Sequence, residues 1–139
     1  MGVRVSTDDS LLDVDLIHRW LSEDAYWSLG RSRAAVQESL RYSVNVGAYD
    51  ADEQVGFLRL VTDRATFAWI CDVYVDPSAR GRAVGKALME EADRLLASYG
   101  VTRALLATAD AHGLYAQYGF VPLADDGRWM VRTYEPAPQ

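Results

Sequence analysis

The sequence has a single cysteine, a single lysine and no long apolar run in its 139 residues. Because Cys71 has no partner in the chain, an internal disulfide and a CxxC metal site are excluded, and Cys71 is expected to be a small buried apolar residue. No stretch is apolar enough to span a membrane, and the N-terminal MGVRVSTDDS lacks the apolar core of a signal segment. We therefore expect a cytoplasmic protein that does not contact a membrane.

Basic residues are also scarce, and the formal net charge is −6. This balance argues against a nucleic-acid partner, because phosphate backbones require a basic face. The one basic spot is RGRAVGKAL, in which Arg80 and Arg82 precede Lys86. Such a spot suits a small anionic ligand better than a polyanion, with a solvated helix face as the alternative. No spacing of His, Cys and carboxylates fits a metal site, so no metal is expected.

The hydrophobic pattern predicts one mixed α/β domain over residues 1–139, in the order β-α-α-β-β-β-α-β-α-β-β. Short polar connections between the three middle strands predict an antiparallel meander. The predicted helix caps are Ser32 and Asp110 at N-termini, and Gly100 and Gly119 after C-termini. Strands are expected at 3–7, 44–50, 54–63, 66–76, 103–109, 120–124 and 128–135, and helices at 13–24, 32–43, 84–100 and 111–118.

Residues 80–88 follow Asp76-Pro77 and open the predicted helix at 84–100. A P-loop is excluded, because Arg80 stands where its first glycine belongs and Ala87 where its Ser or Thr belongs. A dinucleotide-binding GxGxxG is excluded because no third glycine completes the pattern. The helix start remains a candidate phosphate site, where backbone N–H groups and the positive end of the helix dipole face an anion.

Two motifs together resemble the GNAT superfamily of acyl-CoA-dependent N-acyltransferases. The VDP stretch followed by RGRAVG at 80–85 resembles the family's motif A, and LYAQYGF at 114–120 resembles its motif B. The resemblance covers roughly residues 3–135. It implies a single GNAT-like domain with a mixed, mostly antiparallel sheet flanked by helices, and it implies acetyl-CoA as the cofactor.

The resemblance also implies which residues contact the cofactor. A main-chain N–H near residues 73–75 is the expected donor to the oxyanion that forms on the thioester. Ala83 stands where the family usually has glycine. Alanine suits a first helical turn, but its methyl near the pyrophosphate is expected to weaken cofactor binding somewhat. The full set of expected cofactor contacts is Val73, Tyr74, Val75, Arg80, Gly81, Arg82, Ala83, Val84, Gly85 and Lys86.

The implied reaction is attack of a neutral amine on the acetyl thioester. Tyr115 falls on the motif B position whose hydroxyl protonates the leaving thiolate in many relatives, with a buried structural aromatic as the alternative. Asp72 is the expected general base, because it is a charged residue in an apolar strand; an ion pair with Arg59 is the alternative. Strand alternation puts Asp72 on one face with Ile70 and Tyr74.

In the family the acceptor site is commonly lined by the region between the first two helices, here residues 22–31. Asp24, Tyr26 and Trp27 are the candidate acceptor contacts, because aromatic faces beside carboxylates suit a cationic amine. Aromatic packing is the alternative. The resulting hypothesis is an N-acetyltransferase acting on a primary amine of a small molecule or peptide. Transfer of another acyl group and a catalytically silent CoA-binding regulatory module are the alternatives. A homodimer is compatible with the pattern, with 128–135 as a plausible exposed edge.

Overall fold

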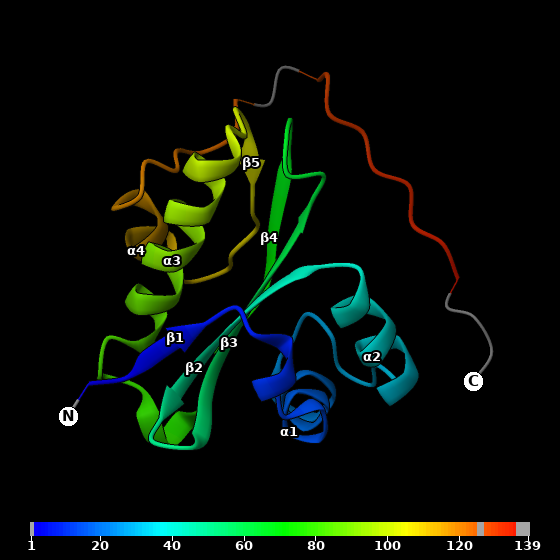
Figure 1. Cartoon of the computed structure of the whole chain (residues 1–139). Helices are drawn as coiled ribbons and strands as arrows, with labels where there is room; N and C mark the ends of the chain where they lie inside the picture. The colour runs from blue at the N-terminus through cyan, green and yellow to red at the C-terminus, as the bar shows by residue number, and fades with distance from the viewer. Residues whose placement is uncertain (1, 125–126, 136–139) are drawn as a thin grey trace.

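The computed structural model describes residues 2–124 and 127–135, in which a twisted sheet separates two groups of helices (Figure 1). The five-stranded sheet has the order β1-β2-β3-β4-β5. The first four strands are antiparallel neighbours, and β5 lies parallel to β4. The mixed, mostly antiparallel sheet is therefore confirmed. Its strands are β1 (Arg4–Ser6), β2 (Val44–Asp50), β3 (Glu53–Thr62), β4 (Ala68–Val75) and β5 (Ala104–Leu105).

Two pairs of helices cover the two faces of the sheet. In Figure 1, α3 and α4 lie on one side, and α1 and α2 lie on the other. The helix predicted at 13–24 is divided in the structure, because α1 passes into a π-helical turn over Trp20–Asp24. The α-helices are α1 (Val14–Arg19), α2 (Arg33–Arg41), α3 (Val84–Tyr99) and α4 (His112–Ala116).

Each face of the sheet has its own apolar core. The larger core lies under α3, and the smaller one lies under α1, the π-helical turn and α2. Burial on both faces explains why β2 and β3 read as nearly continuous apolar runs. The buried residues that α3 contributes are Val84, Leu88, Met89, Ala92 and Leu96.

The helix ends follow local chemistry, with one exception. Ser32 caps α2 as predicted, accepting a hydrogen bond from Ala35 N at 3.1 Å. Gly100 and Gly119 have φ of 77° and 87°, the left-handed conformation that ends a helix. The prediction that Asp110 caps α4 is wrong. The helix begins later, and the N–H before it donates to Thr108 Oγ1 instead.

A β-bulge interrupts β4 at Asp72. Leu58 of β3 lies opposite two residues of β4, Asp72 and Val73, and Asp72 has a φ of 53°. The extra residue reverses the alternation, so Ile70 belongs to the core under α3 and Tyr74 to the core under α1 and α2. The expected common face for Asp72, Ile70 and Tyr74 is therefore wrong.

The last two predicted strands are also absent from the described residues. Segments 120–124 and 127–135 form no strand, and residues 125–126 lie outside the described part of the chain. The strand predicted at 103–109 is reduced to Ala104–Leu105. In Figure 1 the segment drawn in red descends on the side of the molecule opposite α3 and α4. The predicted element order thus holds as far as α4.

Candidate functional site

The sheet opens between β4 and β5. The two strands share a short register, with Ala68 opposite Ala104 and Trp69 opposite Leu105. Beyond this point, residues 71–75 of β4 have no strand neighbour on that side within the described chain. Edge backbone of this kind can bind an extended ligand through its N–H and C=O groups, and the bulge changes the direction in which those groups point.

A 3₁₀ turn over Pro77–Ala79 leads from the end of β4 into the loop that opens α3. Gly81 and Ala83 both adopt left-handed conformations, with φ of 84° and 62°, and both are exposed. Ala83 occupies the N-cap position and offers no side-chain acceptor, so the first N–H groups of α3 have no intrahelical or capping partner. A Cβ built on Gly81 meets nothing within 4 Å. The loop therefore suits a phosphate-bearing group such as the pyrophosphate of coenzyme A.

Ala83 is not in the first helical turn, contrary to expectation. Its left-handed φ is a conformation that glycine adopts readily and alanine adopts only at a cost in free energy. The left-handed backbone at this position therefore explains why glycine is usual here in the family, apart from any contact with the cofactor.

Arg80 and Tyr74, predicted to contact the cofactor, lie against Asp24, predicted to contact the acceptor. The Arg80 guanidinium lies 5.5 Å from the centre of the Tyr74 ring, and its Nη2 lies 3.6 Å from Asp24 Oδ2. The Tyr74 hydroxyl donates to the same carboxylate oxygen. Burial, and then the Asp24 carboxylate, raise the pKa of Tyr74 to about 12. The two predicted subsites therefore meet at Asp24.

The other predicted cofactor residues surround the helix start. The side chains of Val73 and Val75 pack against the core under α3, which leaves their main chain at the open edge. Arg82 is paired with Asp50 at 2.9 Å, and Lys86 is exposed. Val84 is buried in the same core and Gly85 packs against α4, so these two residues fix the position of the helix start.

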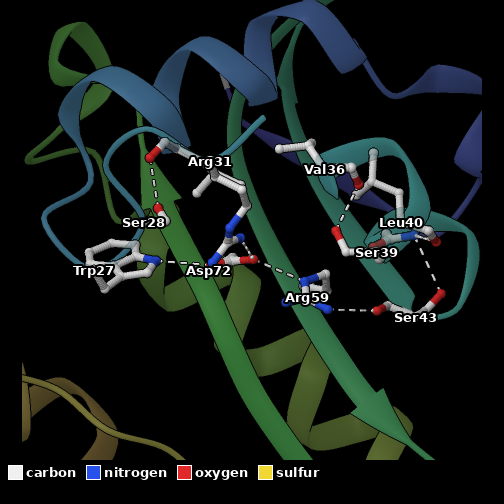
Figure 2. Close-up of polar contacts among 11 residues, drawn as sticks. Trp27, Ser28, Arg31, Val36, Ser39, Leu40, Ser43, Arg59 and Asp72 are labelled. Atoms are coloured by element: carbon white, nitrogen blue, oxygen red, sulfur yellow. Dashed lines mark hydrogen bonds and ion pairs between the residues drawn. The ribbon is translucent and has the colours of Figure 1, made fainter. Parts of the chain in front are cut away.

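Asp72 is the centre of a buried ionic cluster (Figure 2). Its Oδ2 accepts hydrogen bonds from Arg31 at 2.8 Å and from Arg59 at 2.9 Å, and its Oδ1 accepts from Trp27 Nε1 at 2.9 Å. Burial opposes ionisation, but the two guanidinium groups outweigh it and lower the pKa of Asp72. A carboxylate whose two oxygens are both occupied is a poor proton acceptor. The geometry therefore favours the ion-pair alternative over the general base.

The sequence pattern pointed to Arg59 as a partner of Asp72 but missed Arg31 and Trp27. Both come from the acceptor loop, residues 25–31, which lies about 40 positions earlier in the chain. No local signal links them to β4. Trp27 is thus an anchor of the acceptor loop as well as a candidate acceptor contact.

The side chain of Tyr26 reaches from the acceptor loop to the segment that precedes α4. Its hydroxyl accepts a hydrogen bond from Ala109 N at 3.2 Å, and its ring meets Trp27 edge-to-face at 5.0 Å between centroids. Tyr26 remains 59% exposed. Its ring is therefore available to a ligand at the mouth of the opening between β4 and β5.

Tyr115 lies on α4 with 8% of its surface exposed. Burial is the main reason that its pKa is raised, and Asp110 and Tyr26 add to the effect. Tyr115 thus carries its phenolic proton near neutral pH. This protonation state is the one that a general acid requires.

In residues 2–124 and 127–135, no three His, Cys, Asp or Glu side chains gather as a metal site. The helices in this part of the chain include none that is long and apolar enough to cross a membrane. Cys71 is half-buried rather than buried, and burial raises its pKa to about 11, so its thiol stays protonated near neutral pH.

Comparisons with known proteins agree with this architecture. The model of the acetyltransferase (GNAT) family matches residues 14–120. A curated protein of Gibberella zeae with a provisional acetyltransferase name is 32% identical, over 81% of this chain and 75% of that relative. A crystal structure from Xanthomonas campestris pv. campestris, provisionally assigned to the GNAT family, is 45% identical with a TM-score of 0.91, covering 96% of this chain and 94% of that chain. An aminoglycoside 6′-N-acetyltransferase solved with coenzyme A shares the fold at 24% identity and a TM-score of 0.64, over 76% of this chain and 61% of that chain.

Ala83→Gly should relieve the left-handed strain. We expect the free energy of unfolding in urea to rise by about 0.5–1 kcal/mol, and acetyl-CoA to bind at least as tightly in calorimetry. Ala97→Gly, within α3, is the matched control and should lose about 1 kcal/mol of stability. Severalfold weaker acetyl-CoA binding by Ala83→Gly would contradict the assigned role of the loop.

Asp24→Asn should strengthen acetyl-CoA binding by about two- to fivefold, because it removes a carboxylate that competes with phosphate for Arg80 in an exposed ion pair. Asparagine keeps the shape and can still accept from Tyr74. Asp15→Asn breaks a similar exposed pair with Arg33, remote from the loop, and should leave the calorimetric Kd unchanged. An unchanged or higher Kd for Asp24→Asn would show that Arg80 does not serve the phosphate.

Proposed function

Because the chain belongs to the acetyltransferase (GNAT) family, we propose that it transfers an acetyl group from acetyl-CoA to a primary amine of a small molecule or peptide. Acetyl-CoA is the cofactor of this family. The observation that carries the proposal is the position of the open β4 edge, which ends at an uncapped helix start. An extended, phosphate-bearing molecule needs both features side by side.

The residues present fit this cofactor. The first N–H groups of α3, with Arg80, Arg82 and Lys86 around them, would hold its phosphates. The main chain of residues 73–75 would lie along its extended arm, and an N–H of this edge would donate to the thioester oxygen. When bound, acetyl-CoA supplies the activated acetyl group, and the remaining tasks fall to side chains of this chain.

Tyr115 is proposed as the general acid. A C–N bond forms between the amine and the acetyl carbon, the C–S bond breaks, and the leaving sulfur receives the Tyr115 proton. The attacking nitrogen must be neutral, so a protonated acceptor first releases one proton to water. After the attack the nitrogen loses a second proton, which returns to the tyrosinate directly or through water. Because burial raises the pKa of Tyr115, the tyrosinate is a strong base that is rapidly reprotonated.

The proposed acceptor is a cationic primary amine. Tyr26 and Trp27 present exposed aromatic rings at the mouth of the site, and Glu23 and Asp24 lie on the same segment. Aromatic faces and carboxylates together favour a cation. Asp24 already pairs with Arg80 and accepts a hydrogen bond from Tyr74. The aromatic rings of Tyr26 and Trp27 are therefore expected to contribute most of the acceptor affinity.

The activity can be tested by the release of free thiol from acetyl-CoA with a panel of acceptors. The panel should contain diamines and polyamines, peptides with a free N-terminus, neutral amines and amino acids rich in carboxylates. We expect turnover with cationic amines above the rate with water. Tight acetyl-CoA binding in calorimetry with no thiol release for any acceptor would favour the silent CoA-binding module instead. Turnover confined to acidic or neutral acceptors would overturn the acceptor proposal alone.

Tyr115→Phe should lower kcat at least tenfold, because general acid catalysis typically contributes about 10²–10⁴-fold to the rate. The KM for acetyl-CoA should stay within about threefold, since the hydroxyl acts on the leaving group. Tyr42→Phe, at a 72% exposed position that ends α2, is the control and should leave both constants unchanged. A kcat for Tyr115→Phe within twofold of the wild type would exclude the assigned role.

A further inference from the structure

The ionic cluster at the β4 bulge contains more positive than negative charge. Arg31 and Arg59 both donate to the same oxygen of Asp72, and neither forms an ion pair with any other carboxylate of residues 2–124 and 127–135. Two guanidinium groups therefore share one carboxylate, and one positive charge is left unmatched. Charges that are removed from water are normally paired, so this surplus calls for an anion.

Arg31 is the arginine of the cluster that has donors left. Arg59 is fixed twice, because its Nε donates to Asp72 and its Nη1 donates to Ser43 Oγ at 3.0 Å. The Arg31 side chain makes one hydrogen bond to the described residues, from Nη1 to Asp72 Oδ2. The edge formed by its Nε and Nη2 is a fork that matches the two oxygens of a carboxylate. Because the Arg31 side chain is 25% exposed, a small ligand can reach it.

Arg31 lies where the acceptor loop meets the bulge. Trp27 of the same loop donates to the other oxygen of Asp72, so Arg31 and Trp27 meet at one carboxylate (Figure 2). Asp72 directly precedes residues 73–75, the edge that is proposed to lie along the extended arm of the cofactor. A ligand bound by the exposed ring of Trp27 can therefore also place an anionic group on Arg31.

We propose that Arg31 is an anion subsite of the acceptor pocket, and that the acceptor is a primary amine with one carboxylate close to it, as in an amino acid. This inference rests on the proposed function and deepens it by naming the class of acceptor. One carboxylate supplies the single negative charge that the cluster lacks, whereas a phosphate dianion exceeds it. A peptide N-terminus has no carboxylate beside its amine, so the subsite favours a free amino acid over a peptide.

The overall charge of the chain makes this subsite distinguishable from a general attraction. The formal net charge is −6, and Glu23 and Asp24 lie on the segment that leads into the acceptor loop. This field attracts cations and repels free carboxylates. Without a local site, the affinity for a series of amines should therefore rise with their positive charge. A preference for the less positive, carboxylate-bearing member of a series requires a subsite such as Arg31.

The first test is calorimetry with two matched series of ligands, on the protein alone and on the protein saturated with coenzyme A. One series is L-lysine, L-lysinamide and cadaverine, and the other is L-arginine, L-argininamide and agmatine. In at least one series the acid should bind about tenfold more tightly than the amide and the decarboxylated amine, because only the acid forms a charge-assisted pair with Arg31. Equal or weaker binding of the acid in both series, or no binding of any ligand, would overturn the proposal.

The second test is the same calorimetry on Arg31→Gln, which should lose the preference for the acid and keep the wild-type affinity for coenzyme A. Asp72 keeps Arg59 as its partner in this variant, so the remaining pair is neutral and the chain should stay folded, as urea unfolding can verify. If Arg31→Gln does not fold, Arg31→Lys replaces it. Lysine keeps the charge but not the fork, so the preference should fall by about threefold or more.

Arg33→Gln is the matched control, because it removes an exposed arginine that pairs with Asp15 two positions further along the chain. It should keep the full preference for the acid. A preference that survives both Arg31 variants, or that Arg33→Gln removes as completely, would overturn the assignment of the subsite to Arg31.

The release of thiol from acetyl-CoA with the same ligands separates this inference from the proposed function. Binding of the acids that depends on Arg31, with no thiol release, would overturn acetyl transfer and leave the anion subsite intact. Thiol release with cadaverine or agmatine, together with no preference for the acids in calorimetry, would overturn the subsite and leave acetyl transfer intact.

Discussion

The buried pairing of Asp72 with Arg31 and Arg59 is the interaction on which the candidate site depends. Asp72 combines two unfavourable features, a left-handed backbone on a non-glycine residue and a carboxylate removed from water. The two guanidinium groups and Trp27 satisfy both carboxylate oxygens and hold the bulge in place. Without the bulge, Tyr74 would turn toward α3 and the order of side chains along the open edge would be reversed.

Residues 24–31 contact both the bulge in β4 and the loop before α3. Trp27 and Arg31 attach the acceptor loop to the bulge, and Asp24 attaches the end of the preceding π-helical turn to Arg80 in the loop before α3. Single π-helical turns within α-helices are rare and often occur at functional sites. The candidate acceptor residues and the candidate phosphate loop are therefore connected through polar contacts, although they are far apart in the sequence.

Much of the fold could be predicted because its determinants are local. Ser32, Gly100 and Gly119 act on the backbone within a few residues of themselves, and the spacing of the two motifs led to the correct family and cofactor. Asp110 is not the cap because α4 begins at His112, which puts Ala111 at the N-cap position, and Ala111 N donates to Thr108 Oγ1. Tyr115 stays a proposal, since its burial and raised pKa are compatible with an acid and with a structural aromatic.

The sequence by itself determined most of the helices, the central antiparallel strands and the expectation of a phosphate site at residues 80–88, because periodicity, caps and helix N-termini are properties of short segments. Tertiary structure alone decided the bulge, the contacts of Asp72 and the position of the C-terminal segment. Each of these depends on a partner distant in the chain. The residues after α4 have strand-forming side chains, but a strand needs a neighbouring edge, and the alternating pattern does not say which edge that is.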